Sequence, residues 1–216
     1  MSPLLPAGHD SRNLARYASG SRLYDWHTRV FHERLLAHVR TAAPASVLDV
    51  GCGEGFVAAR IGERMPGVAI TGIDESAGAV AFARDHFGTH GTYEVGSVYA
   101  LPYADRQFDL VLCSEVLEHL DRPEAALAEV ARVARQHVLL SVPLEPYFDA
   151  INRFGRRLGV GGDPGHVNFW TRATWAAWVR RHFEQATVET SLVYNVALAD
   201  VRPLDVRPVD MRQARG

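Results

Sequence analysis

The sequence predicts an α/β protein whose mostly parallel sheet is covered by helices on both faces. Short, strongly apolar runs alternate with segments of helical periodicity, which is the order expected when helices connect parallel strands. Three glycines follow the first apolar run of this alternation and precede its first connecting helix. With 216 residues, 47% of them hydrophobic, the chain is long enough for one such domain with a full core.

The elements follow in order from these patterns. Apolar positions at helical spacing predict a helix over residues 23–39, which the Pro-containing stretch at 41–44 brings to an end. Pro123 is well placed for the first turn of a later helix. The predicted buried strands cover residues 46–50, 68–73, 92–95, 108–113 and 137–142, and the helices between them cover residues 55–64, 76–87 and 123–134.

A different pattern begins after residue 143. Glycines, prolines and aromatic residues predict an insertion or substrate lid, followed by a helix over residues 171–182. We expect a long strand over 185–196 and a short one over 198–201, which pair antiparallel at the sheet edge. A single domain is expected over residues 1–216, with an N-terminal arm and helix (1–43), a ligand-binding core (44–143), the lid (144–170), a C-terminal helix and strands (171–201) and a tail (202–216).

Composition excludes several classes of protein. The formal net charge of −2 provides no overall basic field, so nucleic acid is not an expected partner. Cys52 and Cys113 form no Cys-x-x-Cys pair, which argues against a thiolate zinc site and against a disulfide framework. The N-terminus lacks the pattern of a signal peptide, and no apolar run approaches the roughly 20 residues of a membrane span. We therefore expect a cytoplasmic protein, with no indication of its oligomeric state.

The glycine turn is the first candidate binding feature. Gly51, Gly53 and Gly55 let the backbone turn sharply and let a ligand lie against the main chain. The free N–H groups of the helix that follows favour a negative group, either a carboxylate or a pyrophosphate. A dinucleotide fingerprint needs its third glycine where this chain has Phe56. The turn alone therefore predicts a nucleotide-like ligand without identifying it.

The wider pattern resembles a known family. Residues 47–55, Val-Leu-Asp-Val-Gly-Cys-Gly-Glu-Gly, look like motif I of the class I S-adenosylmethionine (SAM)-dependent methyltransferases, and Phe-Asp-Leu-Val-Leu-Cys at 108–113 looks like motif IV. The resemblance covers about residues 45–143 and is closest to methyltransferases of types 11 and 12. It implies a Rossmann-like fold with a seven-stranded, mostly parallel sheet and an antiparallel edge strand. It also makes 44–143 the SAM-binding core, with S-adenosylhomocysteine (SAH) as the product.

The same resemblance assigns the cofactor contacts. Asp74 ends the second strand and would accept hydrogen bonds from both ribose hydroxyls, although the alternative role of capping the next helix stays open for Asp74 and Ser76. Ser97 stands where the family commonly has an adenine-binding aspartate, with Val98 beside it. The expected cofactor-binding residues are Asp49, Gly51, Cys52, Gly53, Gly55, Asp74, Glu75, Ser97, Val98, Ser114 and Glu115.

A Glu/His pattern follows the fourth strand. Glu115, Glu118 and His119 are spaced so that a helix would present all three on one face. With the later His166, they are similar to the metal-binding pattern of quinone-biosynthesis O-methyltransferases and small-RNA 2′-O-methyltransferases. This implies a divalent cation held by Glu115, Glu118, His119 and His166. Two alternatives stay open: His119 acts as a general base without metal, or the cluster is structural.

These residues predict the reaction. An oxygen acceptor must be deprotonated, and the cluster supplies the means, so we expect O-methylation of a small molecule with His119, Glu115 and His166 as catalytic residues. The alternatives are an RNA 2′-O-methyltransferase, a nicotinamide-dependent oxidoreductase and a SAM-binding regulatory protein without turnover. The sequence does not identify the acceptor.

Overall fold

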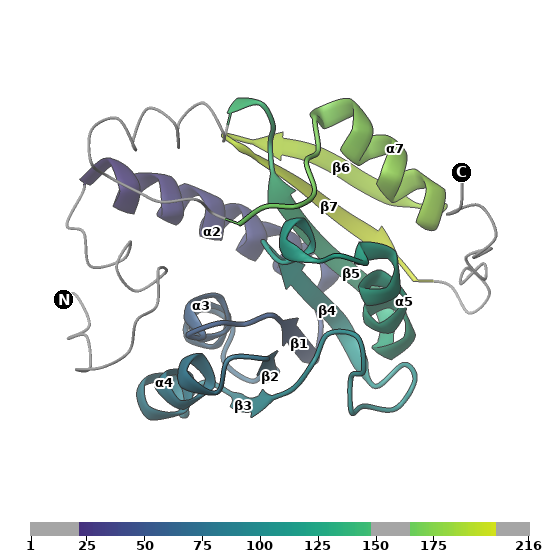
Figure 1. The fold of residues 1–216 in the computed structure, drawn as a ribbon. Coiled ribbons are helices and arrows are strands. Elements are labelled where there is room, and N and C mark those ends of the chain that lie inside the picture. The colour runs from purple at the N-terminus through teal and green to yellow at the C-terminus, as the bar shows by residue number, and fades with distance from the viewer. Residues whose placement is uncertain (1–21, 148–164, 202–216) are drawn as a thin grey trace.

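The computed structural model describes residues 22–147 and 165–201. Within these ranges one seven-stranded sheet has helices on either side (Figure 1). The strands are β1 (Ser46–Val50), β2 (Ala69–Asp74), β3 (Thr92–Val95), β4 (Phe108–Ser114), β5 (Ala134–Pro143), β6 (Ala186–Ser191) and β7 (Tyr194–Asp200). The helices are α2 (Arg22–Ala42), α3 (Phe56–Arg64), α4 (Ala77–Phe87), α5 (Pro123–Val133) and α7 (Arg172–His182), with a single 3₁₀ turn, η1 (Leu117–His119), after β4.

The strand order places the ligand edge of the sheet. The order is β3-β2-β1-β4-β5-β7-β6, and the pairs among β1 to β5 are parallel, whereas β7 is antiparallel to both β5 and β6. This confirms the predicted fold class. The chain runs outward from β1 to β3 and then crosses to β4 on the other side of β1. In such sheets ligands bind beyond the carboxyl ends of the strands at this reversal, here between β1 and β4.

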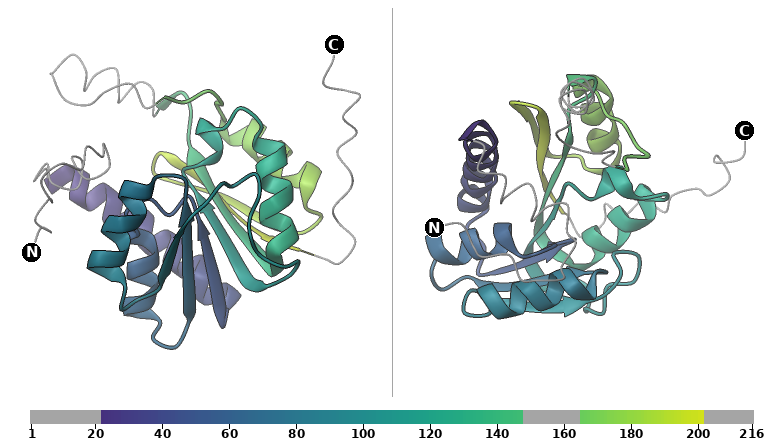
Figure 2. Two further views of the ribbon diagram at one scale, coloured as in Figure 1. Left: turned by 60° about the horizontal axis from the view of Figure 1, so that its bottom comes forward. Right: turned by 60° about the vertical axis from the view of Figure 1, so that its left-hand side comes forward.

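Two hydrophobic cores, one on each face of the sheet, explain why the central strands are apolar throughout. Along β4, Leu110 and Leu112 contact the cluster that includes α2, α3 and α4, whereas Val111 and Cys113 contact the cluster that includes α5 and α7. Figure 2 shows these two groups of helices on opposite faces. All four side chains are fully buried. A strand buried on both faces lacks the polar alternation of a half-exposed one.

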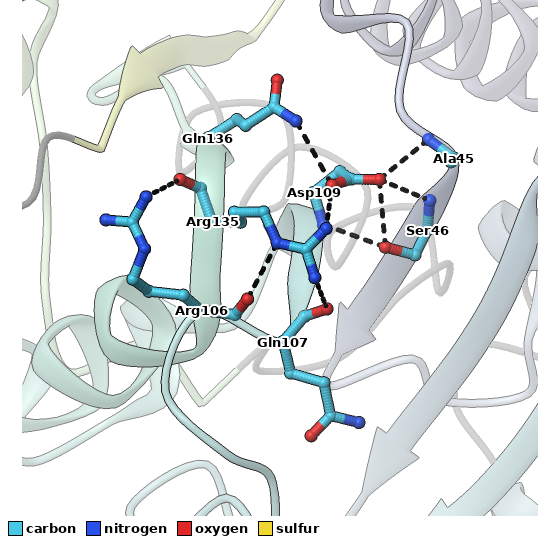
Figure 3. A network of polar contacts seen from close by, with 7 residues as sticks. All are labelled: Ala45, Ser46, Arg106, Gln107, Asp109, Arg135 and Gln136. Atoms are coloured by element: carbon cyan, nitrogen blue, oxygen red, sulfur yellow. Dashed lines mark hydrogen bonds and ion pairs between the residues drawn. The ribbon is translucent and has the colours of Figure 1, made fainter.

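Asp109 organises the amino end of the sheet (Figure 3). Its carboxylate accepts hydrogen bonds from the backbone N–H groups of Ala45 and Ser46, at 3.0 and 3.1 Å, and from the side chains of Arg135 and Gln136, at 3.0 and 3.2 Å. Burial alone would raise the pKa of Asp109, but the hydrogen bonds from Ala45 and Ser46 and the charge of Arg135 outweigh it and lower that pKa. The network therefore joins the first residues of β1, β4 and β5.

The C-terminal strands correct one sequence prediction. The long strand expected over 185–196 is wrong, because the chain reverses at Leu192 and Val193 and forms the β6–β7 hairpin, with Ser191 opposite Tyr194. Residues 198–200 accordingly continue β7 rather than forming a separate strand. Leu192 adopts a φ of 55°, an unusual conformation for a bulky residue. The turn lacks the Asn-Gly or Gly residues that normally indicate a tight hairpin.

Some expectations lie outside the described residues. The predicted arm before residue 22, the tail after 201 and most of the predicted lid, at 148–164, belong to this category. Strand β5 begins at Ala134, directly after α5, three residues earlier than expected. Among the helices of residues 22–147 and 165–201, none is both long and apolar enough to cross a membrane.

Candidate active site

The glycine turn lies where β1 ends, against the end of β2. Gly51, Gly53 and Gly55 have φ values of 71°, 53° and 81°. The N–H groups of Gly51 and Cys52 both donate to the carbonyl of Ile73, at 2.7 and 3.2 Å. Burial, then the charge of a neighbouring aspartate, raises the pKa of the Cys52 thiol, so this cysteine is a neutral part of the turn. Gly55 is the N-cap of α3 and provides no side-chain cap to the N–H groups of that helix.

Gly55 also allows close packing behind the turn. A Cβ added to Gly55 would lie 2.9 Å from Cε1 of Tyr93 and 3.0 Å from Cβ of Ala83. The left-handed backbone conformation and this close approach therefore both require glycine at position 55.

Two acidic residues occupy different environments beside this turn. Asp49 is buried, and its Oδ2 has no hydrogen-bond partner among the described residues. Burial, and secondly the charge of Asp74, raise the pKa of Asp49 from 3.8 to about 7. Asp74 is half-buried, and its carboxylate accepts from the N–H groups of Gly53 and Ser76 at 2.9 and 2.8 Å. The alternative role in capping the next helix is therefore observed: Asp74 accepts a hydrogen bond from the N-cap residue of α4, and the side chain of that residue, Ser76, caps the helix. Glu75, the other predicted cofactor contact here, is exposed.

The predicted adenine turn follows β3 and is held next to Asp74. The N–H of Gly96 donates to the Asp74 carbonyl at 2.9 Å. Ser97 forms the turn itself, because its Oγ accepts from the N–H of Tyr99 at 3.3 Å and its carbonyl accepts from the N–H of Ala100 at 3.2 Å. Val98 is half-buried and packs against the core. The structure thus brings 97–98 to the same sheet edge as the glycine turn.

The residues after β4 depart from the predicted helix. Glu115 has a φ of 58°, and only residues 117–119 form a turn of 3₁₀ helix, so the common helical face for Glu115, Glu118 and His119 is wrong. Glu115 instead turns toward β5: its N–H donates to the Ser141 carbonyl at 3.1 Å, and its Oε1 accepts from the Ser141 hydroxyl at 3.1 Å. Because that hydroxyl proton is used, Ser114 is the donor in the 2.8 Å bond between the two serine hydroxyls.

A compact carboxylate–histidine cluster lies beside this turn. The metal-binding atoms of Glu118, His119 and His166 lie within 4.8 Å of one another, and Glu115 lies outside this group. Glu118 is 1% exposed, and neither of its carboxylate oxygens has a hydrogen-bond partner on another described residue. Burial, and then the charge of Glu115, raise the pKa of Glu118 well above its ordinary value. The Nε2 of His119 is 3.9 Å from Glu118 Oε1, and its Nδ1 is 3.2 Å from the Gly165 carbonyl.

Backbone contacts bring the distant histidine to this cluster. The N–H groups of Val167 and Asn168 donate to the carbonyl of Glu118, at 2.8 and 3.1 Å. The side-chain amide of Asn168 donates to the carbonyls of Leu117 and Leu120, at 3.0 and 2.7 Å. These bonds fix the segment that carries His166 directly onto η1.

Sequence reasoning missed Glu145, which lies just after β5. This residue is buried, and its Oε1 is 4.0 Å from Nδ1 of His166. Its own N–H donates to the carbonyl of Trp170 at 3.0 Å, which ties the end of β5 to the segment after His166. The available signal was its position: acidic residues directly after parallel strands lie at the ligand edge of the sheet.

The arrangement separates the turns after β1, β2 and β3 from the carboxylate–histidine cluster after β4 and β5. The turns after β1, β2 and β3 offer backbone N–H groups and two aspartates, which suit the amino acid, ribose and base of SAM. The turns after β4 and β5 bring a buried carboxylate and two imidazoles together. Such a set can accept a proton or coordinate a divalent cation.

Comparisons with known proteins find similarity to methyltransferases. The family model described as "Methyltransferase domain" matches residues 48–142. A malonyl-[acyl-carrier protein] O-methyltransferase of Geobacter sulfurreducens is 36% identical over 103 residues, covering 47% of this chain and 39% of that protein. A ubiquinone biosynthesis O-methyltransferase of Thiobacillus denitrificans is 41% identical over 110 residues, covering 46% and 45%. The chain thus spans less than half the length of these curated relatives.

Solved structures share the fold over more of the chain. Magnesium protoporphyrin IX methyltransferase from Synechocystis PCC 6803, solved with bound SAH, gives a TM-score of 0.65 at 15% identity and covers 89% of this chain and 95% of its own. The methyltransferase domain of bacterial CtHen1 gives 0.61 at 22% identity, covering 81% and 99%. The matched family model and the strand order together show a methyltransferase domain over residues 48–142, on a Rossmann-like sheet.

Proposed function

We propose that this protein transfers the methyl group of SAM to an oxygen atom of a small-molecule acceptor. The observation that carries the proposal is the cluster of Glu118, His119 and His166, which lies at the same sheet edge as the cofactor turns. A hydroxyl acceptor needs a group that removes its proton or stabilises the resulting oxyanion, and this cluster supplies one. The two curated relatives described above carry O-methyltransferase names, which supports the same acceptor atom.

On the cofactor side, the chain binds and orients the methyl donor. SAM supplies an activated methyl group on a sulfonium, which is already a good leaving group, so alignment and water exclusion are the main tasks of the protein. The glycine turn and the N-terminus of α3 would receive the carboxylate of the donor, and Asp74 its ribose hydroxyls. Asp49, with its unsatisfied Oδ2, suits a donor group or positive charge beside the turn.

On the acceptor side, His119 is the first candidate for the general base. It is the most exposed member of the cluster, with 42% of its side chain accessible, and it lies beside the buried Glu118 carboxylate. Removal of the acceptor proton would leave a positive imidazolium that this carboxylate stabilises. In this step the acceptor oxygen gains the methyl group, SAH leaves, and the imidazole of His119 keeps the acceptor's proton.

The second candidate role is coordination of a divalent cation by Glu118, His119 and His166. The fit rests on Glu118, a buried carboxylate without hydrogen-bond partners on other described residues, next to two imidazoles and near a second carboxylate, Glu115. A cation would compensate these negative charges and act as a Lewis acid on the acceptor hydroxyl. Glu115 would then act indirectly, through its charge.

Calorimetry separates these proposals. SAH should bind with and without EDTA, and no binding under any condition would reject the cofactor assignment. Mn²⁺ titration of the wild type, Glu118→Gln and His166→Ala tests the cation, with His137→Ala as a control, since His137 contacts Asp200 at the far end of β5. Mn²⁺ binding that Glu118→Gln abolishes supports coordination. Loss of methyl transfer in His119→Ala, with no cation bound to the wild type, supports the general base.

An RNA 2′-O-methyltransferase is the rival function. The Glu118/His119/His166 cluster, whose sequence pattern resembles that of small-RNA 2′-O-methyltransferases, favours it, whereas the net charge of −2 does not. The two functions differ in salt dependence: RNA binding should weaken steeply between 50 and 200 mM salt as counterion release predicts, roughly tenfold or more, whereas a small phenol should bind almost equally. Methylation of neither RNA nor a panel of phenols, catechols and carboxylic acids would instead favour a SAM-binding regulatory protein.

A further inference from the structure

Two residues on α5 form hydrogen bonds to the segment that follows the predicted adenine turn. Arg132 uses all five of its N–H donors, at 2.8 to 3.0 Å: two reach the carboxylate of Glu129, and the others reach the carbonyls of Leu101 and Tyr103 and the carboxylate of Asp105. Glu129 Oε2 also accepts from the N–H of Leu101 at 2.9 Å. The Glu129–Arg132 pair therefore satisfies both polar groups of the Leu101 backbone, as a neighbouring strand would.

The pair remains charged over the whole working pH range. The hydrogen bond from Arg132 is the main cause that lowers the pKa of Glu129, and the bond to Glu129 is the main cause that raises the pKa of Arg132. Both side chains are about a quarter exposed, so the contact is partly screened by water. Its importance lies in geometry: a planar guanidinium fixes two backbone carbonyls and one side-chain carboxylate of one loop at defined positions.

The loop that this pair holds, residues 101–105, follows directly on the turn at Ser97 and Val98. That turn is held on one side by the bond from Gly96 to the carbonyl of Asp74, and it closes through the bond from the N–H of Ala100 to the carbonyl of Ser97. Leu101, the next residue, is the first one held by α5. The backbone of the turn is therefore held at one end by β2 and at the other by the Glu129–Arg132 pair, while the Tyr99 side chain between them contacts Arg122.

The serine at position 97 makes the fixed position of this turn important for recognition of the base. A serine oxygen reaches less far than a carboxylate, so discrimination of the base depends more on the backbone N–H of the turn, which must lie in the plane of the adenine ring. Backbone donors discriminate only when they are held within a fraction of an ångström, as other preorganised binding groups are.

We propose that the Glu129–Arg132 pair is a positioning element that sets the affinity and base selectivity of the SAM site by fixing the 97–101 turn. Neither residue is a catalytic residue; both act through the backbone of Leu101 and its neighbours. The proposal rests on the proposed SAM-dependent function, and its test separates the two.

The test compares Arg132→Lys and Glu129→Gln with the matched control Arg135→Lys. Arg135 begins the adjoining strand and also donates to backbone carbonyls, those of Arg106 and Gln107, but it does so at the amino end of the sheet beside Asp109 (Figure 3). Calorimetry measures the Kd of SAH and of S-inosyl-L-homocysteine, whose hypoxanthine replaces the adenine amino group by a carbonyl and carries a proton on N1. Thermal unfolding of each variant records the loss of stability separately.

The wild type should prefer SAH over the inosine analogue. Arg132→Lys should weaken SAH binding about tenfold, the factor expected when one hydrogen bond between the turn and the base is misaligned, and should reduce the preference for SAH. Arg135→Lys should lower Tm while leaving both Kd values unchanged. A pure loss of stability cannot change the ratio of the two Kd values, so that ratio identifies a positioning role.

Two results would overturn the proposal. The first is an unchanged Kd ratio in both Arg132→Lys and Glu129→Gln, or an equal change in Arg135→Lys. The second is a wild type that binds both compounds equally well, since the turn would then not read the base. Absence of SAH binding by the wild type would reject the proposed function itself, which is a distinct outcome.

Discussion

Replacing Asp49 by asparagine should change how the folding stability of the protein depends on pH. Asp49 is 3% exposed and lies near Asp74, and its pKa is raised from 3.8 to about 7, first by burial and then by the charge of Asp74. A shift of about three pKa units corresponds to roughly 4 kcal/mol between the protonated and ionised forms. Because the folded-state pKa is the higher one, Asp49 stabilises the fold fully below about pH 4, and this contribution is lost as the pH rises through 7.

Urea denaturation of the wild type and of Asp49→Asn across this window gives the measurement. The difference between the two free energies of unfolding should change by about 4 kcal/mol from low to neutral pH, with the wild type losing the stability. Titrating groups that do not interact with Asp49 cancel in this difference because both proteins contain them. Parallel pH profiles for the two proteins would refute the reasoning, since an unperturbed carboxyl at position 49 would produce no such change.

Three further substitutions test other parts of the structure. Asp109→Asn should cost roughly 2 kcal/mol near neutral pH, through weakened charge-assisted bonds. The lowered pKa of Asp109 means that this cost should shrink as acid protonates the wild type, and a cost independent of pH would contradict the assignment. Gly55→Ala should cost about 1 to 3 kcal/mol more than Gly67→Ala by urea denaturation. Both positions have positive φ, but a Cβ at Gly67 has nothing within 4 Å, so equal costs would exclude the close-packing argument. Glu145→Gln should lower kcat roughly tenfold or more by releasing His166, without changing the Kd of SAH; an unchanged kcat would show that Glu145 does not orient the histidine.

The geometry of the turns after β1 and β2 could be predicted because its signals are local. Gly51, Gly53 and Gly55 occupy positive φ values that their spacing already indicated, and Asp74 follows a strand whose apolar run is easily recognised. A parallel sheet then brings the carboxyl ends of adjacent strands together without further information. Short-range patterns and a general rule of topology were sufficient here.

The geometry of the turns after β4 and β5 could be predicted less well because tertiary contacts determine it. The i, i+3, i+4 spacing suggested a helix, but hydrogen bonds to Ser141 turn Glu115 toward β5 instead. Glu145 was overlooked because its approach to His166 depends on contacts between the end of β5 and the 165–170 segment. The hairpin at Leu192 shows the same limit, since antiparallel pairing of the flanking strands holds a turn that no local residue preference predicts.

The four hydrogen bonds that fix Val167 and Asn168 to η1 also bear on how acceptor choice can change in this fold. They lie after residue 165 and give the neighbouring histidine an anchor of its own. A substituted or lengthened stretch of sequence between Tyr147 and Gly165 would then leave the proton-handling cluster in register with the cofactor turns. The anchor of the histidine and the sequence of that stretch can therefore be varied independently of each other.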